Sequence, residues 1–316
     1  MIKSFIKFVE DREFNLIKLF YPSFLLPLIS ISDNGFKAVK EYGYCKGTEL
    51  VIEGSKLYAL SDSAECLQYS RYLCGSWYNV RDYLEEAHDD FKDLVNEMIS
   101  LYTDVSISTS PLDDLELFTS IILSRNTDYH RNTVRWVKKL LKTFPSIESL
   151  ISVEPLSLTT RISGSYQVLE LPKTLNCYLR MRNFLSGSPE NSRALLTCPG
   201  IGPKTLYAYM LFVKLNPSYA PIDTNLIRFL NKLKGLREVV SRLTLPIKNY
   251  CLKYVCDECP VRKTCIEAFL RSRLGRLSGW FQTVVFLHSK TFCSIKRCVK
   301  CPLSRKCLMS LTSSPS

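Results

Sequence analysis

The alternation of hydrophobic and polar residues predicts a β-hairpin in the N-terminal third of the chain. Residues 49–60 (ELVIEGSKLYAL) alternate on both sides of a Gly-Ser pair, which is typical of two antiparallel strands joined by a tight turn. Residues 77–98 (WYNVRDYLEEAHDDFKDLVNEM) predict the end of a strand followed by a helix. We therefore expect a small α+β domain over residues 1–110.

Further along, the hydrophobic period becomes that of helices. Residues 192–197 (SRALLT) and 206–215 (LYAYMLFVKL) are helical on either side of the turn in CPGIGPKT. The second segment has no polar face for two turns, so we expect a buried central helix. A glycine-rich turn lets the backbone approach a ligand, and the following helix N-terminus suits a phosphate. A plain connector between two helices is the alternative interpretation of the turn alone.

Two oppositely charged residues flank this buried segment. Lys204 follows the turn, and Asp223 precedes apolar residues that recur at helical spacing from Leu226 to Leu233. By position alone Asp223 is an N-cap. Two adjacent elements would also bring both side chains to one cleft. There a partly desolvated lysine can form a Schiff base, and a carboxylate can take up its proton or stabilise an oxocarbenium-like sugar. Cleavage of an N-glycosidic bond in DNA requires this chemistry.

The positive charge is concentrated in the last third of the chain. Residues 225–316 contain 18 Lys and Arg against 4 Asp and Glu (+14), and the first 224 residues contain 24 against 26 (−2), which together give the net charge of +12. This asymmetry indicates a polyanionic partner. Nucleic acid is favoured over a membrane because no amphipathic anchor or lipidation signal is present. The apolar segment 19–31 contains two prolines and is too short to span a bilayer.

Eight of the 13 cysteines form two sets with the same spacing. C-x4-C-x2-C-x5-C occurs twice, each time with proline after the third cysteine. The first set is Cys251, Cys256, Cys259 and Cys265, and the second set is Cys293, Cys298, Cys301 and Cys307. The remaining five are scattered, and we interpret them as small core hydrophobic residues: Cys45, Cys66, Cys74, Cys177 and Cys198.

Three kinds of cross-link are compatible with the two sets. Disulfides are disfavoured because the rest of the chain is typical of a cytosolic protein, in which thiols stay reduced. Structural zinc sites usually have two C-x2-C pairs or include histidine, whereas each set has one such pair and no histidine. Four thiolates around one loop suit a [4Fe–4S] cluster. We expect a cluster at the second set, and a second cluster or zinc at the first.

Four segments in the same order resemble the helix-hairpin-helix (HhH-GPD) DNA glycosylases related to endonuclease III. They are SIILSRNTD (120–128), PGIGPKT (199–205), APIDTNLIRFL (220–230) and LHSKTFCSIKRCVKCPLSRKC (287–307). The resemblance covers residues 112–307 and implies a mainly α fold, in which two helical subdomains enclose a DNA-binding cleft and carry an iron–sulfur loop. The N-terminal α+β domain resembles that of the 8-oxoguanine glycosylases, with a generic appended domain as the alternative.

The resemblance implies a bifunctional DNA glycosylase/AP lyase. Lys204 would attack the sugar C1′ of a flipped nucleotide, Asp223 would be the essential aspartate, and the strand would be nicked by β-elimination. A monofunctional glycosylase and a non-catalytic HhH DNA-binding protein are the alternatives. The cysteine segment favours oxidised pyrimidines as substrate, and the N-terminal domain favours 8-oxoguanine. The residues expected to contact DNA are Gly200, Ile201, Gly202, Thr205, Arg125, Asn126, Lys296, Arg297 and Lys300.

Three departures from the family pattern affect these expectations. Arg125 and Asn126 stand where the family has a glutamine. The second set has four residues after its first cysteine, where endonuclease III has six. The first set has no counterpart in that enzyme.

The sequence thus predicts four regions. They are the α+β domain with its β-hairpin (1–110), the helical HhH-GPD core (111–236), a basic cysteine-rich region with one or two metal sites (237–310) and a disordered tail (311–316). We expect a monomer that binds double-stranded DNA with a damaged base and does not bind membranes. Its expected location is the cytoplasm of a prokaryote, in association with the nucleoid.

Overall fold

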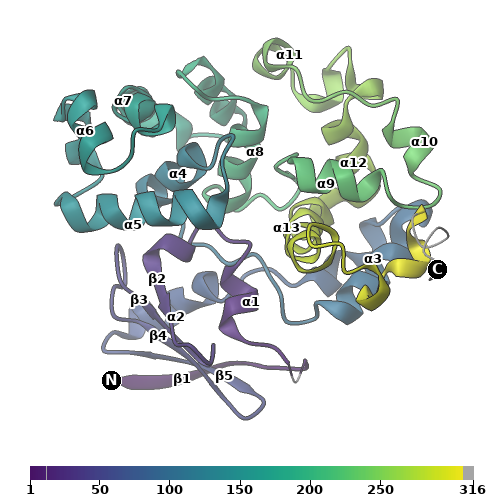
Figure 1. Cartoon of the computed structure of the whole chain (residues 1–316), viewed down its shortest axis with the longest axis horizontal. Coiled ribbons are helices and arrows are strands. Elements are labelled where there is room, and N and C mark those ends of the chain that lie inside the picture. Colours follow the sequence, from purple (N-terminus) through teal and green to yellow (C-terminus); the bar gives the residue numbers. More distant parts are fainter. Residues whose placement is uncertain (12, 309–316) are drawn as a thin grey trace.

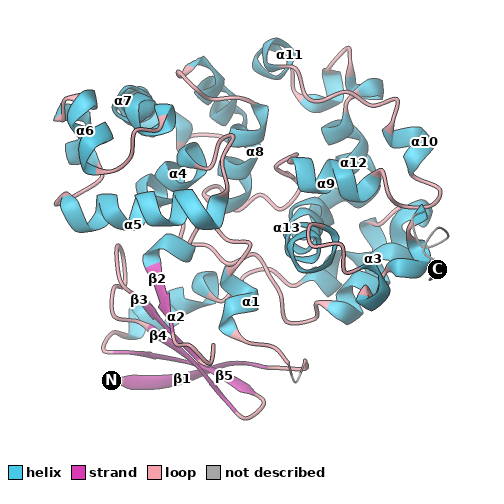
Figure 2. Cartoon of the chain, in the orientation of Figure 1, coloured by secondary structure: helices cyan, strands magenta, loops and turns pink. Residues whose placement is uncertain are grey.

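A computed structural model of the protein describes residues 1–11 and 13–308. The fold is mainly helical with one antiparallel sheet near the N-terminus (Figures 1 and 2), as predicted. The strands are β1 (Ile2–Phe8), β2 (Ile29–Ile31), β3 (Lys37–Lys40), β4 (Glu49–Glu53) and β5 (Lys56–Ser61). The α-helices are α1 (Leu16–Phe20), α2 (Ala64–Leu73), α3 (Asp89–Leu101), α4 (Asp114–Leu123), α5 (Val134–Thr143), α6 (Pro155–Arg161), α7 (Tyr166–Leu185), α8 (Pro203–Phe212), α9 (Thr224–Leu230), α10 (Arg237–Val240), α11 (Lys248–Lys253), α12 (Ile266–Leu274) and α13 (Ser278–His288).

Shorter helical turns connect these elements. The 3₁₀ turns are η1 (Leu26–Leu28), η2 (Val80–Glu86), η4 (Glu148–Ser152), η5 (Pro189–Thr197), η6 (Cys256–Glu258), η7 (Arg262–Thr264), η8 (Gly275–Leu277), η10 (Cys298–Lys300) and η11 (Ser304–Lys306), and the π-helical turns are η3 (Tyr129–Thr133) and η9 (Ser289–Cys293). The segment 192–197, predicted as helix, is therefore 3₁₀ rather than α. The predicted disordered tail, 311–316, lies outside the described residues.

The sheet contains the predicted hairpin. Its strand order is β1-β5-β4-β3-β2, and all neighbouring strands are antiparallel. Strands β4 and β5 pair with Val51 opposite Tyr58 and Glu53 opposite Lys56, so the hairpin over 49–60 is confirmed. Helix α2 packs against β1 and β5.

The helix expected within residues 77–98 is present as α3, preceded by the 3₁₀ turn η2, but the strand end expected before it is wrong. The Trp77 Nε1 donates to Ile107 O at 2.8 Å, and the Tyr78 hydroxyl donates to Arg276 O at 3.0 Å. These contacts anchor the segment to distant parts of the chain instead of to the sheet. The side chain of Asn79 then accepts a hydrogen bond from Arg81 N and starts η2.

Helix α3 packs with the C-terminal part of the molecule. It contacts α12 and lies beside the C-terminal segment in Figure 1, away from the sheet. The turn before it is held by hydrogen bonds from His88 N to Arg273 O and from Arg276 Nε to Glu86 Oε1. The N-terminal 110 residues therefore contribute both the sheet and a helix, α3, that packs against α12.

Helices α8 and α13 are almost wholly buried. Every residue of α8 from Thr205 to Phe212 is buried, as are most residues of α13. The prediction that α8 is a central helix without a polar face is confirmed. No helix within residues 1–11 and 13–308 is long and apolar enough to cross a lipid bilayer.

A buried ion pair joins the sheet to the helical part. Lys40 Nζ at the end of β3 lies 2.6 Å from Asp113 Oδ2, which precedes α4, and the two side chains are 0% and 3% exposed. The second oxygen of Asp113 accepts from Tyr44 N. Because each buried charge is partnered, the pair fixes the junction between the α+β domain and the helical core.

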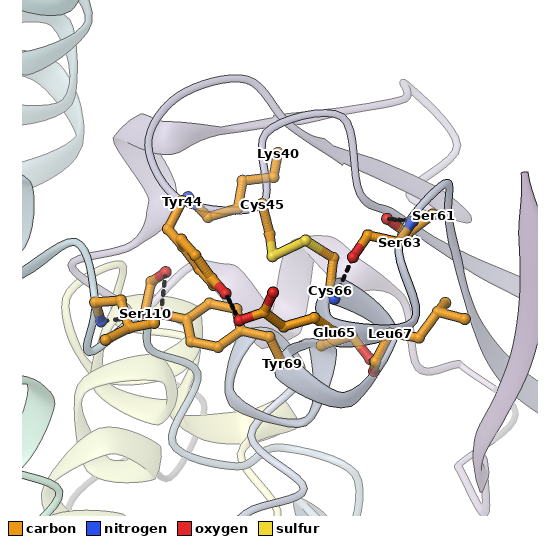
Figure 3. The surroundings of a disulfide bond; sticks show 12 residues. Lys40, Tyr44, Cys45, Ser61, Ser63, Glu65, Cys66, Leu67, Tyr69 and Ser110 are labelled. Carbon is orange, nitrogen blue, oxygen red and sulfur yellow. Dashed lines mark hydrogen bonds between the residues drawn. A yellow bond between two sulfur atoms is a disulfide. The ribbon is translucent and has the colours of Figure 1, made fainter.

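Four of the five scattered cysteines form disulfides, so their interpretation as unpaired core residues is wrong. Cys45 in the β3–β4 loop is bonded to Cys66 in the first turn of α2 (Figure 3). Cys177 in α7 is bonded to Cys198, the residue before the glycine-rich turn. The fold brings these residues together from 21 positions apart in each case. The fifth of these scattered cysteines, Cys74, is free and buried, as predicted.

Candidate functional site

The glycine-rich turn joins η5 to α8. Gly200 has a φ of +71° and Gly202 a φ of −119°, so only Gly200 needs glycine for its backbone conformation. A Cβ on Gly200 would lie 2.1 Å from Nη1 of Arg125, whereas a Cβ on Gly202 would meet nothing within 4 Å. The fold does not require glycine at 202, and the bare backbone there leaves space for a ligand.

The start of α8 presents unpaired backbone donors. The first α8 hydrogen bond runs from Leu206 N to Gly202 O at 3.0 Å. Within the described residues, the N–H of Gly202 has no protein acceptor. Pro203 has no N–H, and those of Lys204 and Thr205 precede the first helical hydrogen bond and are also unpaired. Ile201 is 2% exposed and its N–H donates to Cys198 O, so Ile201 anchors the turn. Thr205 is also buried.

Arg125, predicted to contact DNA, is engaged inside the protein. Its Nε donates to Ile122 O at 2.9 Å, its Nη1 to Gly200 O at 2.6 Å, and its Nη2 pairs with Glu170 Oε2 at 3.1 Å. The side chain is 15% exposed. Arg125 therefore clamps the glycine-rich turn to the end of α4. The next residue, Asn126, is exposed and has a φ of +48°.

Lys204 and Asp223 line one cavity of about 350 Å³. Asp223 is 9% exposed, and its Oδ1 accepts from Leu226 N at 2.7 Å. It is thus both the N-cap of α9 and a wall of the cavity. Lys204 is exposed and has no hydrogen bond or ion pair with any described residue. The expected partial desolvation of this lysine is not present in the protein alone.

Aromatic rings and one amide form other walls of this cavity. Phe24 packs edge-on against Tyr129 and Phe212, with ring centroids 5.4 and 5.1 Å apart, and Phe286 of α13 also lines the cavity. Gln282, one helical turn before Phe286, is 7% exposed, and its amide bonds to no described residue. An unpaired amide beside aromatic rings suits a planar heterocycle with polar edges.

A second carboxylate and two more cations complete the lining. Asp128 Oδ1 accepts from Arg131 N at 2.9 Å, and its Oδ2 lies 3.5 Å from Lys290 Nζ. The backbone hydrogen bond and the Lys290 ammonium hold the pKa of Asp128 below its usual value, so it stays ionised. Arg228 of α9 also lines the cavity.

Sequence reasoning missed most of this lining. Asp128 and Lys290 lie within two of the four segments that resemble the glycosylase family (120–128 and 287–307). Their position there was the sign in the sequence that they could belong to the site. Gln282 and Phe286 show only the i, i+4 spacing of a helix, which is also the pattern of a core. Phe24 comes from the N-terminal region and gave no signal.

The thiols of each cysteine set lie close together. Cys251 interacts electrostatically with Cys259 and Cys265. In the second set, Cys301 interacts in the same way with its three partners, and burial raises its pKa to about 11. Among the residues described by the structure, no group of three His, Cys, Asp or Glu side chains has a geometry that could hold a metal ion. Metal binding at both sets stays a prediction.

A buried histidine outside both sets contacts the second one. His288 is fully buried, with Nδ1 2.7 Å from the Tyr102 hydroxyl and Nε2 3.4 Å from Cys301 Sγ. Burial lowers the pKa of His288 to about 4, so the ring is neutral. The hydroxyl of Tyr102 and the thiol of Cys301 can each donate or accept, so these contacts are compatible with both tautomers of the neutral ring.

The cationic loop of the second set is open to solvent. Lys296, Arg297 and Lys300 are exposed, and none of them bonds or pairs with a described side chain. Ile295 and Val299 lie among them and are 51% and 91% exposed. The loop is therefore a free basic surface, as the sequence predicts.

No protein-family model and no curated protein matches this sequence, but solved structures match nearly the whole chain. The 8-oxoguanine glycosylase/lyase of Clostridium acetobutylicum, in complex with double-stranded DNA containing cytosine opposite 8-oxoG, has a TM-score of 0.65 at 16% identity, over 92% of this chain and 98% of its own. MBOgg1 in complex with a low-affinity DNA ligand has a TM-score of 0.66 at 16% identity, over 92% and 99%. The 3-methyladenine DNA-glycosylase of Archaeoglobus fulgidus has a TM-score of 0.62 at 13% identity, over 92% and 99%.

The fold of this chain is therefore similar to that of helix-hairpin-helix DNA glycosylases. A match over 92% of the chain leaves out far fewer residues than the first 110, so the likeness includes much of the N-terminal α+β domain.

Proposed function

We propose that the chain is a bifunctional DNA glycosylase/AP lyase that removes an oxidised base from duplex DNA. The supporting observation is that Lys204 and Asp223 line one cavity directly behind a turn with unpaired backbone N–H groups. An amine, a carboxylate and a phosphate-binding backbone are the groups that base removal and strand scission require.

The chemistry uses residues that the cavity already holds. The Lys204 nitrogen forms a bond to C1′ as the N-glycosidic bond breaks, and the base leaves with the bonding electrons and takes up a proton from water. Asp223 stabilises positive charge on the sugar and takes up the proton lost by the amine. The resulting imine on the ring-opened sugar acidifies C2′. Loss of a C2′ proton breaks the C3′–O bond and nicks the strand, and water then hydrolyses the imine.

The cavity walls would receive the flipped base. A base between the aromatic rings would place its polar edge near the free amide of Gln282. The N–H of Gly202 and the first turn of α8 would bind a phosphate. The exposed Lys296, Arg297 and Lys300 would contact other phosphates without reading sequence. We propose that the protein acts as a monomer on damaged double-stranded DNA, in the cytoplasm.

We also propose that the second cysteine set holds a [4Fe–4S] cluster. The donor set fits this group because all four side chains are cysteine thiols, His288 Nε2 lies 3.4 Å from Cys301 Sγ, and Lys232 acts electrostatically on Cys293 and Cys307. When bound, the cluster would fix the conformation of the basic loop.

The test is covalent trapping with borohydride. Three labelled duplexes carry thymine glycol, 8-oxoguanine or an abasic site, and each is incubated with the wild type, Lys204→Ala and Gln282→Ala. We expect a protein–DNA adduct with the wild type and none with Lys204→Ala, which should still bind the duplex. The base-containing duplex that gives the adduct identifies the substrate class. Gln282→Ala should lose adduct on that duplex and keep it on the abasic one.

Two outcomes would change the assignment. Base release without an adduct or nick would indicate a monofunctional glycosylase in which Lys204 only contacts DNA. Strand scission that survives in a pure preparation of Lys204→Ala would refute the proposed role of this lysine.

A further inference from the structure

From the second cysteine to the fourth, the two cysteine sets have the same backbone conformation as well as the same spacing, whereas the first cysteines lie in α11 (Cys251) and η9 (Cys293). In each, the second cysteine starts a 3₁₀ turn and the third follows it, and the fourth follows a second 3₁₀ turn. The third cysteines have φ and ψ of −69° and 126° (Cys259) and −76° and 121° (Cys301). The residues before the second turn have −97° and 12° (Val261) and −87° and 10° (Leu303).

The hydrogen bonds inside the two loops correspond one to one. Cys259 N donates to Cys256 O at 3.3 Å, and Cys301 N donates to Cys298 O at 3.1 Å. The third cysteine then accepts at its carbonyl from the residue three positions later, at 3.0 Å in the first set and 3.1 Å in the second. The fourth cysteine donates back to that residue, at 3.3 and 3.1 Å.

Each loop is also attached to the molecule in the same manner. The fourth cysteine forms an isolated β-bridge with an earlier segment, Cys265 with Thr244 and Cys307 with Leu233. The intervening sequences differ, and the bridges differ in direction, parallel and antiparallel. The common feature is therefore the loop that presents the four thiols, and not the surrounding chain.

The first set has buried polar and charged groups of both signs beside it. The Tyr207 hydroxyl lies 3.3 Å from Cys251 Sγ, and the guanidinium of Arg271 acts electrostatically on Cys256. Nη2 of Arg271 pairs with Oε1 of the buried Glu267 at 3.1 Å, and its buried Nε has no partner among the described residues. A cavity of about 290 Å³ is lined by Tyr207, Arg271, Cys251 and Cys256. The second set likewise has a polar ring, His288, and a cation, Lys232, beside its thiols.

We infer that Cys251, Cys256, Cys259 and Cys265 hold a second iron–sulfur cluster, bound by the same loop as the second set. Four thiolates on a cluster carry net negative charge, and the Tyr207 hydroxyl and the unpartnered Nε–H of Arg271 are donors available to its sulfur atoms. The site is independent of the catalytic proposal, because none of its ligands lines the cavity of Lys204. It does contact α8 through Tyr207, three residues after Lys204.

The experiment counts metal in the full chain. The protein is purified without oxygen and reconstituted with ferrous iron and sulfide, and iron, zinc and acid-labile sulfide are then measured per chain. Two [4Fe–4S] clusters give about eight iron and eight sulfide. About four iron in the wild type, with or without one zinc, would overturn the inference.

Variants assign the metal to its loop. Cys256→Ser with Cys259→Ser should halve the iron content and leave the far-UV circular dichroism unchanged. Cys298→Ser with Cys301→Ser should remove the iron of the second set and leave the iron of the first set. Cys74→Ala, at a buried free cysteine outside both sets, is the matched control and should retain all the iron. An unchanged iron content in the first double variant would contradict the inference. The wild-type count decides between one cluster and two even if a variant fails to fold, and it does not depend on glycosylase activity.

Discussion

The two glycines of the hairpin should respond differently to the same substitution. At Gly200, alanine meets a positive φ and the guanidinium of Arg125. A non-glycine residue in the left-handed region costs about 1–2 kcal/mol. Displacing Arg125 also breaks the 2.6 Å hydrogen bond to Gly200 O, and a bond from a charged donor contributes about 1.5–3 kcal/mol. Gly200→Ala should therefore lower the free energy of unfolding by about 3 kcal/mol.

Gly202→Ala is the matched control for stability. Its φ of −119° is open to any residue, and its Cβ would meet nothing. The reduced freedom of the unfolded chain offsets the weaker helix cap, so we expect a change within about 0.5 kcal/mol. The added methyl instead occupies the space where a phosphate would approach the backbone. Loss of a single charge-assisted hydrogen bond there would weaken DNA binding about tenfold.

The measurements are urea unfolding of both variants and fluorescence anisotropy with an abasic-analogue duplex at one fixed salt concentration. Gly200→Ala repeated in an Arg125→Ala background should cost only the backbone contribution, and the difference is the coupling between the two residues. The reasoning fails if Gly202→Ala binds DNA like the wild type. It also fails if Gly202→Ala is as unstable as Gly200→Ala.

Three further predictions follow from buried groups and cross-links. Asp223→Asn should keep the α9 cap and abolish scission of the substrate duplex, whereas Asp223→Ala should also lose about 1 kcal/mol of unfolding free energy. Equal scission by the Asn variant and the wild type would contradict the role of the carboxylate. Burial raises the pKa of Glu116 to about 7 from 4.5, so the folded state binds this proton more tightly than the unfolded chain. The unfolding free energy should then fall as the pH rises from about 4.5 to 7, and Glu116→Gln should remove about 2 kcal/mol of that dependence, as urea titrations at several pH values would show. Replacing both Cys177 and Cys198 by serine should lower the free energy of unfolding by about 3 kcal/mol, because the disulfide closes a loop 21 residues long. Reducing this disulfide in the wild type should lower the free energy of unfolding by the same amount.

Local chemistry explains which parts of the fold could be predicted. The β4–β5 hairpin has strict alternation around a two-residue turn, and α8 has eight consecutive buried residues. Asp223 could be identified as an N-cap because capping depends on the next three residues. In each case the signal and the structure lie within one short segment.

The features that could not be predicted depend on contacts between distant segments. Arg125 was expected to contact DNA because it stands where the resembling family has a glutamine in a DNA-facing loop, but Glu170 and the Gly200 carbonyl bind its guanidinium. The Cys177–Cys198 disulfide could not be paired from spacing, since pairing needs the two Cα positions to meet. Phe24 reaches the cavity of Lys204 from 180 residues earlier, and no periodicity encodes that contact.

The two central residues of the cavity, Asp223 and Lys204, differ in how firmly their side chains are held. Asp223 is fixed by a 2.7 Å cap bond from Leu226 N and by the amide of Asn225, so its carboxylate cannot turn away from the cavity. Lys204 projects from the first turn of a helix that is buried on every side, yet its own side chain is exposed and unpaired in the described structure. The backbone of Lys204 is thus rigid and its amine is free to move. A fixed carboxylate with a mobile amine suits a reaction in which the lysine must first reach C1′ and later carry the opened sugar as an imine. If Lys204 were only a phosphate contact, the precise seating of Asp223 opposite it would have no use beyond capping, and the Asp223→Asn variant distinguishes these two cases.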